Sequence, residues 1–215
     1  MDEMKCKVCI VTGSNSGIGK ETALALAGMN ATVAMAVRNQ EKGEIAKHEI
    51  IDKTENQMTD LMICDLASLT SIRNFAKEFT AKYDRLDVLI NNAGVVMNNR
   101  QTTVDGFERN FAVDYLGPVL LTHELLPLLK SSAPSRIINL SSGLYKSGKI
   151  DFDDLQSEKH YNGMQAYRNA KLMILMFTYE LARRLEGTGV TVNAVQPGFA
   201  ATNLGRNTGS LLQAI

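Results

Sequence analysis

The sequence of 215 residues predicts an α/β fold in which a single domain is built on a doubly wound parallel sheet. The length suits one large domain, and a hydrophobic fraction of 45% is enough for a sizeable core. Short apolar segments alternate with longer helical patterns, which is typical of a parallel sheet covered on both faces. We expect strands at 8–11, 31–37, 61–64, 86–90, 136–140 and 190–195, and helices at 19–28, 41–51, 68–83, 104–130 and 161–186.

Charge and hydropathy exclude several classes of function. The 23 basic and 23 acidic residues cancel and no basic run stands out, so a nucleic-acid partner is not expected. No apolar run reaches the roughly 18–20 residues that span a bilayer, and the N-terminus lacks the apolar stretch of a signal peptide. We therefore expect no membrane span and a cytoplasmic location.

The cysteines Cys6, Cys9 and Cys64 form neither a disulfide framework nor a metal-ligand pattern. Cys6 and Cys9 match C-x-x-C, but they lead into the first expected strand, where residues three apart point to opposite faces. We expect Cys9 in the core and no bound metal.

A glycine-rich turn between the first strand and the first helix predicts a nucleotide site. Residues 12–19 read T-G-S-N-S-G-I-G. Gly13 suits a tight turn, Gly17 lets the backbone approach a pyrophosphate, and Gly19 lets helix and strand pack closely. The helix N-terminus adds free N–H groups and the positive end of its dipole.

The end of the second strand distinguishes NAD from NADP. A carboxylate at this point would bind the ribose 2′-hydroxyl of NAD. Residues 34–39 contain no acid and place Arg38 where a guanidinium can clamp the 2′-phosphate of NADP. The alternative is a solvated loop arginine, and we predict NADP(H).

The spacing of this turn resembles the T-G-x-x-x-G-I-G fingerprint of the short-chain dehydrogenase/reductase family. Further family elements follow: N-N-A-G at 91–94, N-L-S-S at 139–142, Y-x-x-x-K at 167–171 and P-G-x-x-x-T at 197–202. The resemblance spans nearly the whole chain and implies a Rossmann-type NADP(H)-binding domain over residues 1–215. The cofactor contacts that it implies are Gly13, Asn15, Ser16, Gly17, Ile18, Gly19, Arg38, Asp65, Leu66, Asn92, Ala93, Gly94, Tyr167, Lys171, Pro197, Gly198 and Thr202.

Some of these positions have a second interpretation. Asp65 ends the third strand, where the family uses an Asp for the adenine amino group, but it can equally cap the helix that begins near Ser68. The asparagines of N-N-A-G can also tie neighbouring strands together.

Tyr167 and Lys171 lie four residues apart on an expected helix, so their side chains share a face. An ammonium about 4 Å from the phenol, at an effective dielectric of about 20, contributes roughly 4 kcal/mol, or about three pKa units. Lys171 is therefore expected to bring the pKa of Tyr167 near 7, where acid–base catalysis is efficient. The family resemblance implies that Lys171 also holds the nicotinamide ribose and that Ser142 hydrogen-bonds the substrate oxygen.

Asp114 departs from the family pattern. The fourth catalytic member of the family is an Asn in a segment resembling V-N-x-L-G, whereas residues 113–117 read V-D-Y-L-G. An Asp can still order a relay water. If it is ionised near Lys171, however, it opposes the ammonium and raises the pKa of Tyr167.

The chain looks most like the retinol dehydrogenase branch, because Tyr167 lies 25 positions after Ser142 and because of D-L-Q at 154–156 and E-L-A-R-R-L at 180–185. That branch implies a lipophilic alcohol, aldehyde or ketone. Family members continue into another strand and helix, so we expect a C-terminally truncated domain with the sixth strand as a bare apolar edge and 203–213 as the start of a substrate-covering segment. Apolar faces at 120–129 and 172–185 fit burial on the sheet or a homo-oligomer interface.

These features predict an NADP-dependent oxidoreductase for lipophilic alcohols and carbonyls, with Ser142, Tyr167, Lys171 and Asp114 as the catalytic group. A non-catalytic NADP(H)-binding sensor or scaffold is the main alternative, favoured by Asp114 and the early end. An epimerase or dehydratase is less favoured, because such relatives usually carry a larger substrate domain.

Overall fold

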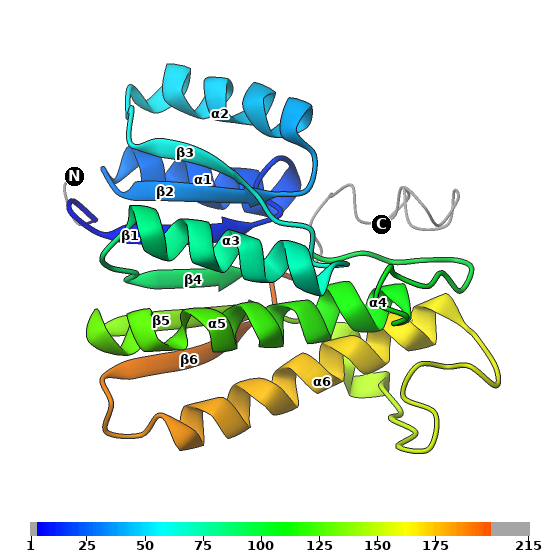
Figure 1. The fold of residues 1–215 in the computed structure, drawn as a ribbon. Helices are drawn as coiled ribbons and strands as arrows, with labels where there is room; N and C mark the ends of the chain where they lie inside the picture. Colours follow the sequence, from blue (N-terminus) through cyan, green and yellow to red (C-terminus); the bar gives the residue numbers. More distant parts are fainter. Residues whose placement is uncertain (1–3, 199–215) are drawn as a thin grey trace.

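The computed structural model describes residues 4–198, which form an α/β domain around one parallel sheet (Figure 1). The strand order is β3-β2-β1-β4-β5-β6, and each neighbouring pair is parallel. The order therefore reverses between β1 and β4, which is where such sheets bind ligands. The strands are β1 (Val8–Thr12), β2 (Thr32–Val37), β3 (Thr59–Ile63), β4 (Val88–Asn91), β5 (Ser135–Leu140) and β6 (Val190–Val195).

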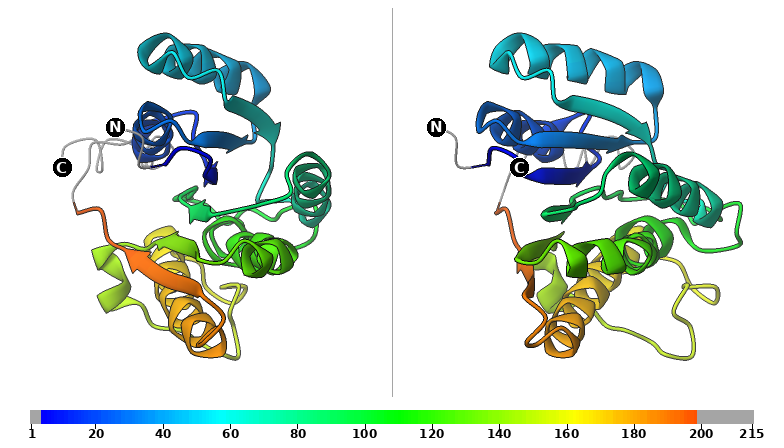
Figure 2. Two further views of the ribbon diagram at one scale, coloured as in Figure 1. Left: turned by 90° about the vertical axis from the view of Figure 1, so that its left-hand side faces the viewer. Right: turned by 60° about the vertical axis from the view of Figure 1, so that its left-hand side comes forward.

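Helices cover both faces of the sheet, as the two views in Figure 2 show. α1 (Gly17–Gly28) and α2 (Gln40–Thr54) pack on one face, while α3 (Leu69–Lys82), α5 (Gly117–Ser131) and α6 (Gly163–Arg184) pack on the other. α5 is preceded by the short α4 (Arg109–Phe111) and a π-helical turn at Ala112–Leu116, and β5 is followed by a 3-10 turn at Gly143–Ser147. The predicted single-domain, doubly wound fold is confirmed.

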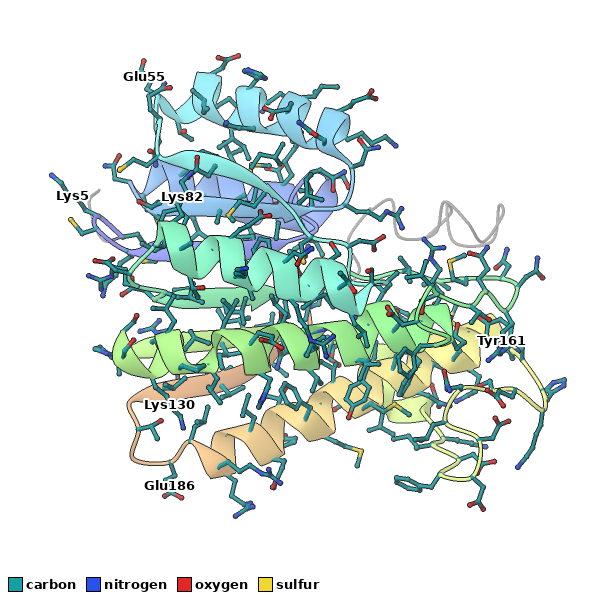
Figure 3. All side chains as sticks on the ribbon, in the orientation of Figure 1. Lys5, Glu55, Lys82, Lys130, Tyr161 and Glu186 are labelled. Atoms are coloured by element: carbon teal, nitrogen blue, oxygen red, sulfur yellow. The ribbon has the colours of Figure 1, made fainter. Side chains whose placement is uncertain are left out.

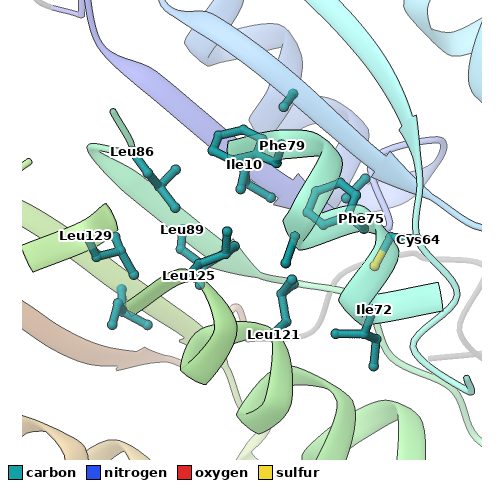
Figure 4. Packing of buried hydrophobic residues seen from close by; sticks show 14 of the residues in the cluster. Ile10, Cys64, Ile72, Phe75, Phe79, Leu86, Leu89, Leu121, Leu125 and Leu129 are labelled. Atoms are coloured by element: carbon teal, nitrogen blue, oxygen red, sulfur yellow. The ribbon is translucent and has the colours of Figure 1, made fainter. Parts of the chain in front are cut away.

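The core has one layer on each face of the sheet. Figure 4 shows the larger layer, in which the rings of Phe75 and Phe79 from α3 and the side chain of Leu125 from α5 pack near Ile10 and Leu89. These five side chains are fully buried. The opposite layer contains several alanines and also Cys9, so the expectation of a core position for Cys9 is confirmed.

Polar side chains cap several helices. Asn39 accepts a hydrogen bond from the Lys42 N–H at 2.8 Å, and Asn162 accepts one from the Gln165 N–H at 2.9 Å. Lys82, in the last turn of α3, places its positive charge at the negative end of the helix dipole (Figure 3). No helix within the described range is long and apolar enough to cross a membrane.

The fold corrects some predicted boundaries. The helix expected over 104–130 begins only at Arg109, because Thr103 and Gly106 form a turn in which the Gly106 N–H donates to the Thr103 carbonyl oxygen and Gly106 adopts a φ of +85°. β3 begins at Thr59, two residues before the expected start. Within residues 4–198, β6 pairs with β5 alone and lies at the sheet edge, as expected; segment 203–213 lies outside the described residues.

A chain of buried amides and hydroxyls connects two central strands to the helices above them. Asn91 at the end of β4 donates from Nδ2 to Thr122 Oγ1 in α5 at 3.1 Å and to Asn139 Oδ1 in β5 at 2.8 Å. Asn139 in turn donates to Thr178 Oγ1 in α6 at 2.9 Å. Because these groups are buried, each lost partner leaves a costly unsatisfied polar atom.

The change Asn139→Ala should therefore lower the free energy of unfolding by about 1–3 kcal/mol, since Asn91 and Thr178 each lose a buried partner. Urea denaturation measures this difference. Asn193→Ala, an exposed position on neighbouring β6, is the matched control and should change stability by less than about 0.5 kcal/mol. Equal effects of the two changes would contradict a stabilising role for the buried chain.

Candidate functional site

A cavity of about 250 Å³ lies at the carboxyl ends of the central strands, where the strand order reverses. Its lining contains most of the positions expected from the sequence: Gly13, Asn15, Ser16, Gly17, Ile18, Gly19, Asn92, Ala93, Gly94, Tyr167, Lys171 and Pro197. Val95, Leu140 and Ser141 also line it and were not expected. The glycine turn and the Y-x-x-x-K face therefore meet in one cavity.

The glycine turn depends on the absence of side chains. Gly13 has a φ of +67°, and a Cβ there would lie 3.0 Å from the Cα of Ala93. A Cβ on Gly19 would collide with the side-chain amide of Asn92 and would lie 2.5 Å from the carbonyl oxygen of Gly13. Gly19 therefore permits a close approach, but its nearest neighbours are the Gly13 turn and the Asn92 side chain, whereas the sequence predicts packing of the helix against the strand.

Thr12 and Asn92 fasten the loop after β4 to this turn. The Thr12 hydroxyl accepts hydrogen bonds from the N–H groups of Asn92 at 2.9 Å and Ala93 at 3.0 Å, and the Asn92 amide donates to the Thr12 carbonyl oxygen at 2.7 Å. The expected tie between strands by asparagine side chains is confirmed. The role of Thr12 was missed, although a threonine at a strand end before glycine was the available signal.

The N-terminus of α1 fits a nucleotide phosphate. Ser16 stands at the N-cap but makes no side-chain capping hydrogen bond, and no acidic residue lies in the first turn. The hydroxyl of Ser14 is buried without a hydrogen-bond partner within residues 4–198. Backbone N–H groups and a positive dipole end therefore face a cavity beside an unused hydroxyl, which suits the pyrophosphate of a dinucleotide.

Arg38 lies directly after β2 and is exposed. Its guanidinium makes no ion pair with any residue in the described part of the chain. It does not line the cavity itself. Arg38 is thus free to meet a negative group that extends beyond the cavity along the end of β2.

Asp65 and Leu66 also lie outside the cavity lining. The capping interpretation of Asp65 is wrong, because Ser68 is the N-cap of α3 and accepts from the Ser71 N–H, while the Asp65 carboxylate accepts from the Ala67 N–H at 3.0 Å. Leu66 is a core residue. Gly198 is described but does not line the cavity, and Thr202 lies outside the described residues.

Tyr167 and Lys171 are buried on the same face of α6. The ammonium nitrogen of Lys171 lies 5.5 Å from the centroid of the Tyr167 ring and donates to the Leu140 carbonyl oxygen at 3.1 Å. The Ser142 hydroxyl hydrogen-bonds the phenol, which favours its ionised form. The Ser141 hydroxyl is already engaged, since it donates to the Lys171 carbonyl oxygen at 3.0 Å. Ser141 lines the cavity, whereas Ser142 is not among the lining residues. The second serine of the pair is therefore the one beside the phenol, and its predicted contact with a substrate oxygen stays a prediction.

Asp114 lies within reach of this group. Its Oδ1 is 3.5 Å from the ammonium nitrogen of Lys171 and accepts a hydrogen bond from the Val95 N–H at 3.0 Å. The carboxylate sits in the π-helical turn Ala112–Leu116, before Pro118. Pro118 has no N–H for the Asp114 carbonyl and its ring crowds that oxygen, which accounts for the widened turn.

The pKa of Tyr167 is raised, whereas the sequence predicts a lowered value. Burial raises the pKa of Tyr167 well above its ordinary value, the charge of Asp114 raises this pKa further, and the hydrogen bond from Ser142 offsets only part of the rise. The expected lowering by Lys171 is wrong for the protein alone, because desolvation dominates and the ammonium is paired with Asp114. Burial likewise raises the pKa of Asp114, to about 6, against the opposing charge of Lys171.

A second polar network near the site was missed from the sequence. Tyr161, labelled in Figure 3, donates to the Met97 carbonyl oxygen and accepts from the Asn110 amide, and it also contacts the buried Glu108 carboxylate. A Cβ on Gly163 would collide with the Met97 carbonyl oxygen. This network holds the segment after N-N-A-G against the start of α6, so it helps to position Tyr167.

Comparisons with known proteins agree with this geometry. The model of the family described as short chain dehydrogenase matches residues 7–211. Human retinol dehydrogenase 13 is 53% identical over 204 residues, covering 94% of this chain and 62% of the relative. Mouse retinol dehydrogenase 14 is 48% identical over 215 residues, covering 95% of this chain and 64% of the relative. The chain thus spans somewhat over six-tenths of the length of these relatives.

Solved structures share the fold. A protein from Mycobacterium paratuberculosis superposes with a TM-score of 0.82 at 38% identity, covering 95% of this chain and 72% of that protein. A structure from Escherichia coli CFT073, solved as a complex with NADPH, gives a TM-score of 0.76 at 25% identity, covering 92% of this chain and 78% of its own. The chain therefore belongs to the short chain dehydrogenase family of oxidoreductases, in its retinol dehydrogenase-like branch.

Proposed function

We propose that this protein is an NADP(H)-dependent oxidoreductase that acts on a lipophilic alcohol, aldehyde or ketone. The observation that carries the proposal is the shared cavity, in which the glycine turn and the open N-terminus of α1 lie next to Tyr167 and Lys171. One half of the cavity suits a dinucleotide, and the other half presents the groups for proton transfer.

The residues that would hold the cofactor come from three elements. The N-terminus of α1 would bind the pyrophosphate, and the segment at Asn92–Gly94 would leave room for the ribose. Arg38 would bind the 2′-phosphate, because it is exposed, unpaired in the described part of the chain and free of a neighbouring acid on β2. When bound, the nicotinamide supplies or accepts the hydride.

Proton transfer would be carried out by Tyr167. In reduction its O–H gives a proton to the substrate oxygen, and in oxidation the phenolate takes the proton from the alcohol. The Ser142 hydroxyl, which already contacts the phenol, would hydrogen-bond the same oxygen as its charge develops. Lys171 would stabilise the phenolate with its positive charge, to the extent that Asp114 leaves that charge unopposed.

The lipophilic substrate class is supported by the names of the similar retinol dehydrogenases and by the apolar side chains of Val95 and Leu140 in the cavity wall. A non-catalytic NADP(H)-binding sensor remains the second candidate. It is favoured by one observation, the Asp114 charge that raises the pKa of Tyr167. An NADPH-oxidation screen against a panel of lipophilic aldehydes and ketones separates these two functions.

Arg38→Ala should weaken NADPH binding by about 1–3 kcal/mol while leaving NADH binding nearly unchanged, because only NADPH carries the 2′-phosphate. Fluorescence titration with both nucleotides measures the preference. Arg73→Ala removes an exposed arginine on α3, outside the cavity, and is the matched control. A wild-type protein that binds NADH as tightly as NADPH would refute the NADP assignment.

Tyr167→Phe should lower kcat by at least about 100-fold and leave NADPH affinity nearly intact, since it removes the transferable proton and little else. Tyr179→Phe makes the same change on an exposed position of α6 and should keep full activity. If the Tyr167 variant retained most of its kcat, the acid–base role would belong to another group.

A further inference from the structure

The Asp114 carboxylate is buried with one oxygen bonded and the other without a partner. Oδ1 accepts from the Val95 N–H and lies 3.5 Å from the ammonium nitrogen of Lys171. Oδ2 is fully enclosed and has no hydrogen-bond partner within residues 4–198. The residue is 1% exposed and Lys171 is 5% exposed, so water screens their interaction poorly.

Burial with incomplete hydrogen bonding favours the neutral acid over the carboxylate at this position. An ionised carboxylate would leave the Oδ2 lone pairs unsatisfied, whereas the neutral acid places a proton on one oxygen and spreads less charge into the buried site. An asparagine at this position would stay neutral at every pH. Asp114 can therefore be neutral or negatively charged, whereas the Asn of the family pattern is always neutral.

The charged and titratable groups that face Asp114 come from two directions. Lys171 and Tyr167 face it from α6, and Glu108 acts on it from the residue before α4. Lys171 favours the carboxylate form, while Glu108 and burial favour the neutral acid. Tyr167 responds in turn to the charge of Asp114. These groups form one coupled set around the reacting phenol.

We propose that Asp114 is a pH-dependent positioning residue, which leaves the Lys171 charge available to Tyr167 when protonated and neutralises that charge when ionised. This inference rests on the proposed oxidoreductase function and adds a built-in pH control to it. The change between the two states is the exchange of one proton between the Asp114 carboxyl group and solvent, and no bond other than that O–H bond forms or breaks.

The direction of the effect follows from the pKa values. Burial raises the pKa of Asp114 to about 6, so the carboxyl is neutral below about this pH and ionised above it. The ionised form raises the pKa of Tyr167. In reduction the phenol then becomes a weaker acid, and in oxidation less phenolate exists near neutral pH. Reduction should therefore slow as pH rises through the Asp114 titration, whereas oxidation should lose part of the increase that a growing phenolate population would otherwise give it.

Asp114→Asn tests this control. The variant keeps an oxygen for the Val95 N–H but cannot ionise, so the fall in the kcat of reduction on passing above about pH 6 should disappear. In oxidation the phenolate population near neutral pH, and with it kcat, should rise by up to about tenfold for each unit by which the Tyr167 pKa falls. Asp84→Asn removes an exposed carboxylate far along the sheet and should leave the profile unchanged. An unaltered profile, or a slower Asn variant, would overturn the proposal.

A second measurement needs no substrate and separates this inference from the proposed function. Near-ultraviolet titration, taken as the difference between each protein and its Tyr167→Phe counterpart, reports the pKa of the phenol. The Asn variant should show a lower value than the wild type, and equal values would overturn the proposal even in an active enzyme. A lower value in a protein that turns over no carbonyl would uphold the coupling and refute the oxidoreductase function.

Carbon NMR of the wild-type Asp114 carboxyl keeps the test valid if the Asn variant does not fold. The carboxyl should titrate near 6. In Lys171→Met, which removes the charge that lowers the Asp114 pKa, the same carbon should titrate at higher pH. A carboxyl that titrates at the value of an exposed aspartate, or that ignores the loss of Lys171, would overturn the proposal.

Discussion

The close approach of β1 to the loop after β4 is the constraint on which the site depends. Three hydrogen bonds between Thr12 and the Asn92–Ala93 segment bring the glycine turn against that loop, and the space between them excludes a Cβ at Gly13 and Gly19. The strand order reverses between β1 and β4, so the segments that follow these two strands lead to opposite faces of the sheet and leave a crevice between them. The N-terminus of α1 and the Tyr167 face of α6 can therefore meet in one cavity.

Burial determines the electrostatics of this cavity more than any single charge does. An ammonium acting alone on a phenol would lower the pKa of Tyr167, as expected from the spacing of Tyr167 and Lys171. In the structure the phenol is largely desolvated and Lys171 has two partners, the Leu140 carbonyl oxygen and the Asp114 carboxylate. Desolvation disfavours the phenolate, and a compensated ammonium offsets little of that penalty.

The parallel sheet, the helices on both faces and most of the cavity lining could be predicted from the sequence, because strand periodicity and a turn between β1 and α1 are local signals. Long-range contacts could not. Leu66 was predicted to contact the cofactor, yet it belongs to the core, and Tyr161 reaches Met97 and Glu108 across more than fifty residues. The start of α4 at Arg109 could not be predicted either, because the apolar pattern over 104–130 is typical of one continuous helix and does not indicate the turn at Thr103–Gly106.

Asp114 shows how a group that tunes the site also acts on the fold. Its pKa in the folded protein lies above its ordinary value, so its contribution to stability is fully present below the unfolded pKa of 3.8 and is lost as pH rises through about 6. Near neutral pH the folded state therefore holds a buried, incompletely bonded carboxylate at a net cost. Lys171 limits that cost through its ion pair, and the same ion pair withdraws positive charge from Tyr167. The Lys171 ammonium therefore has two roles: it stabilises the buried Asp114 carboxylate and it favours ionisation of the Tyr167 phenol. When Asp114 is ionised, the ammonium is paired with it; when Asp114 is protonated, the charge of the ammonium acts on Tyr167.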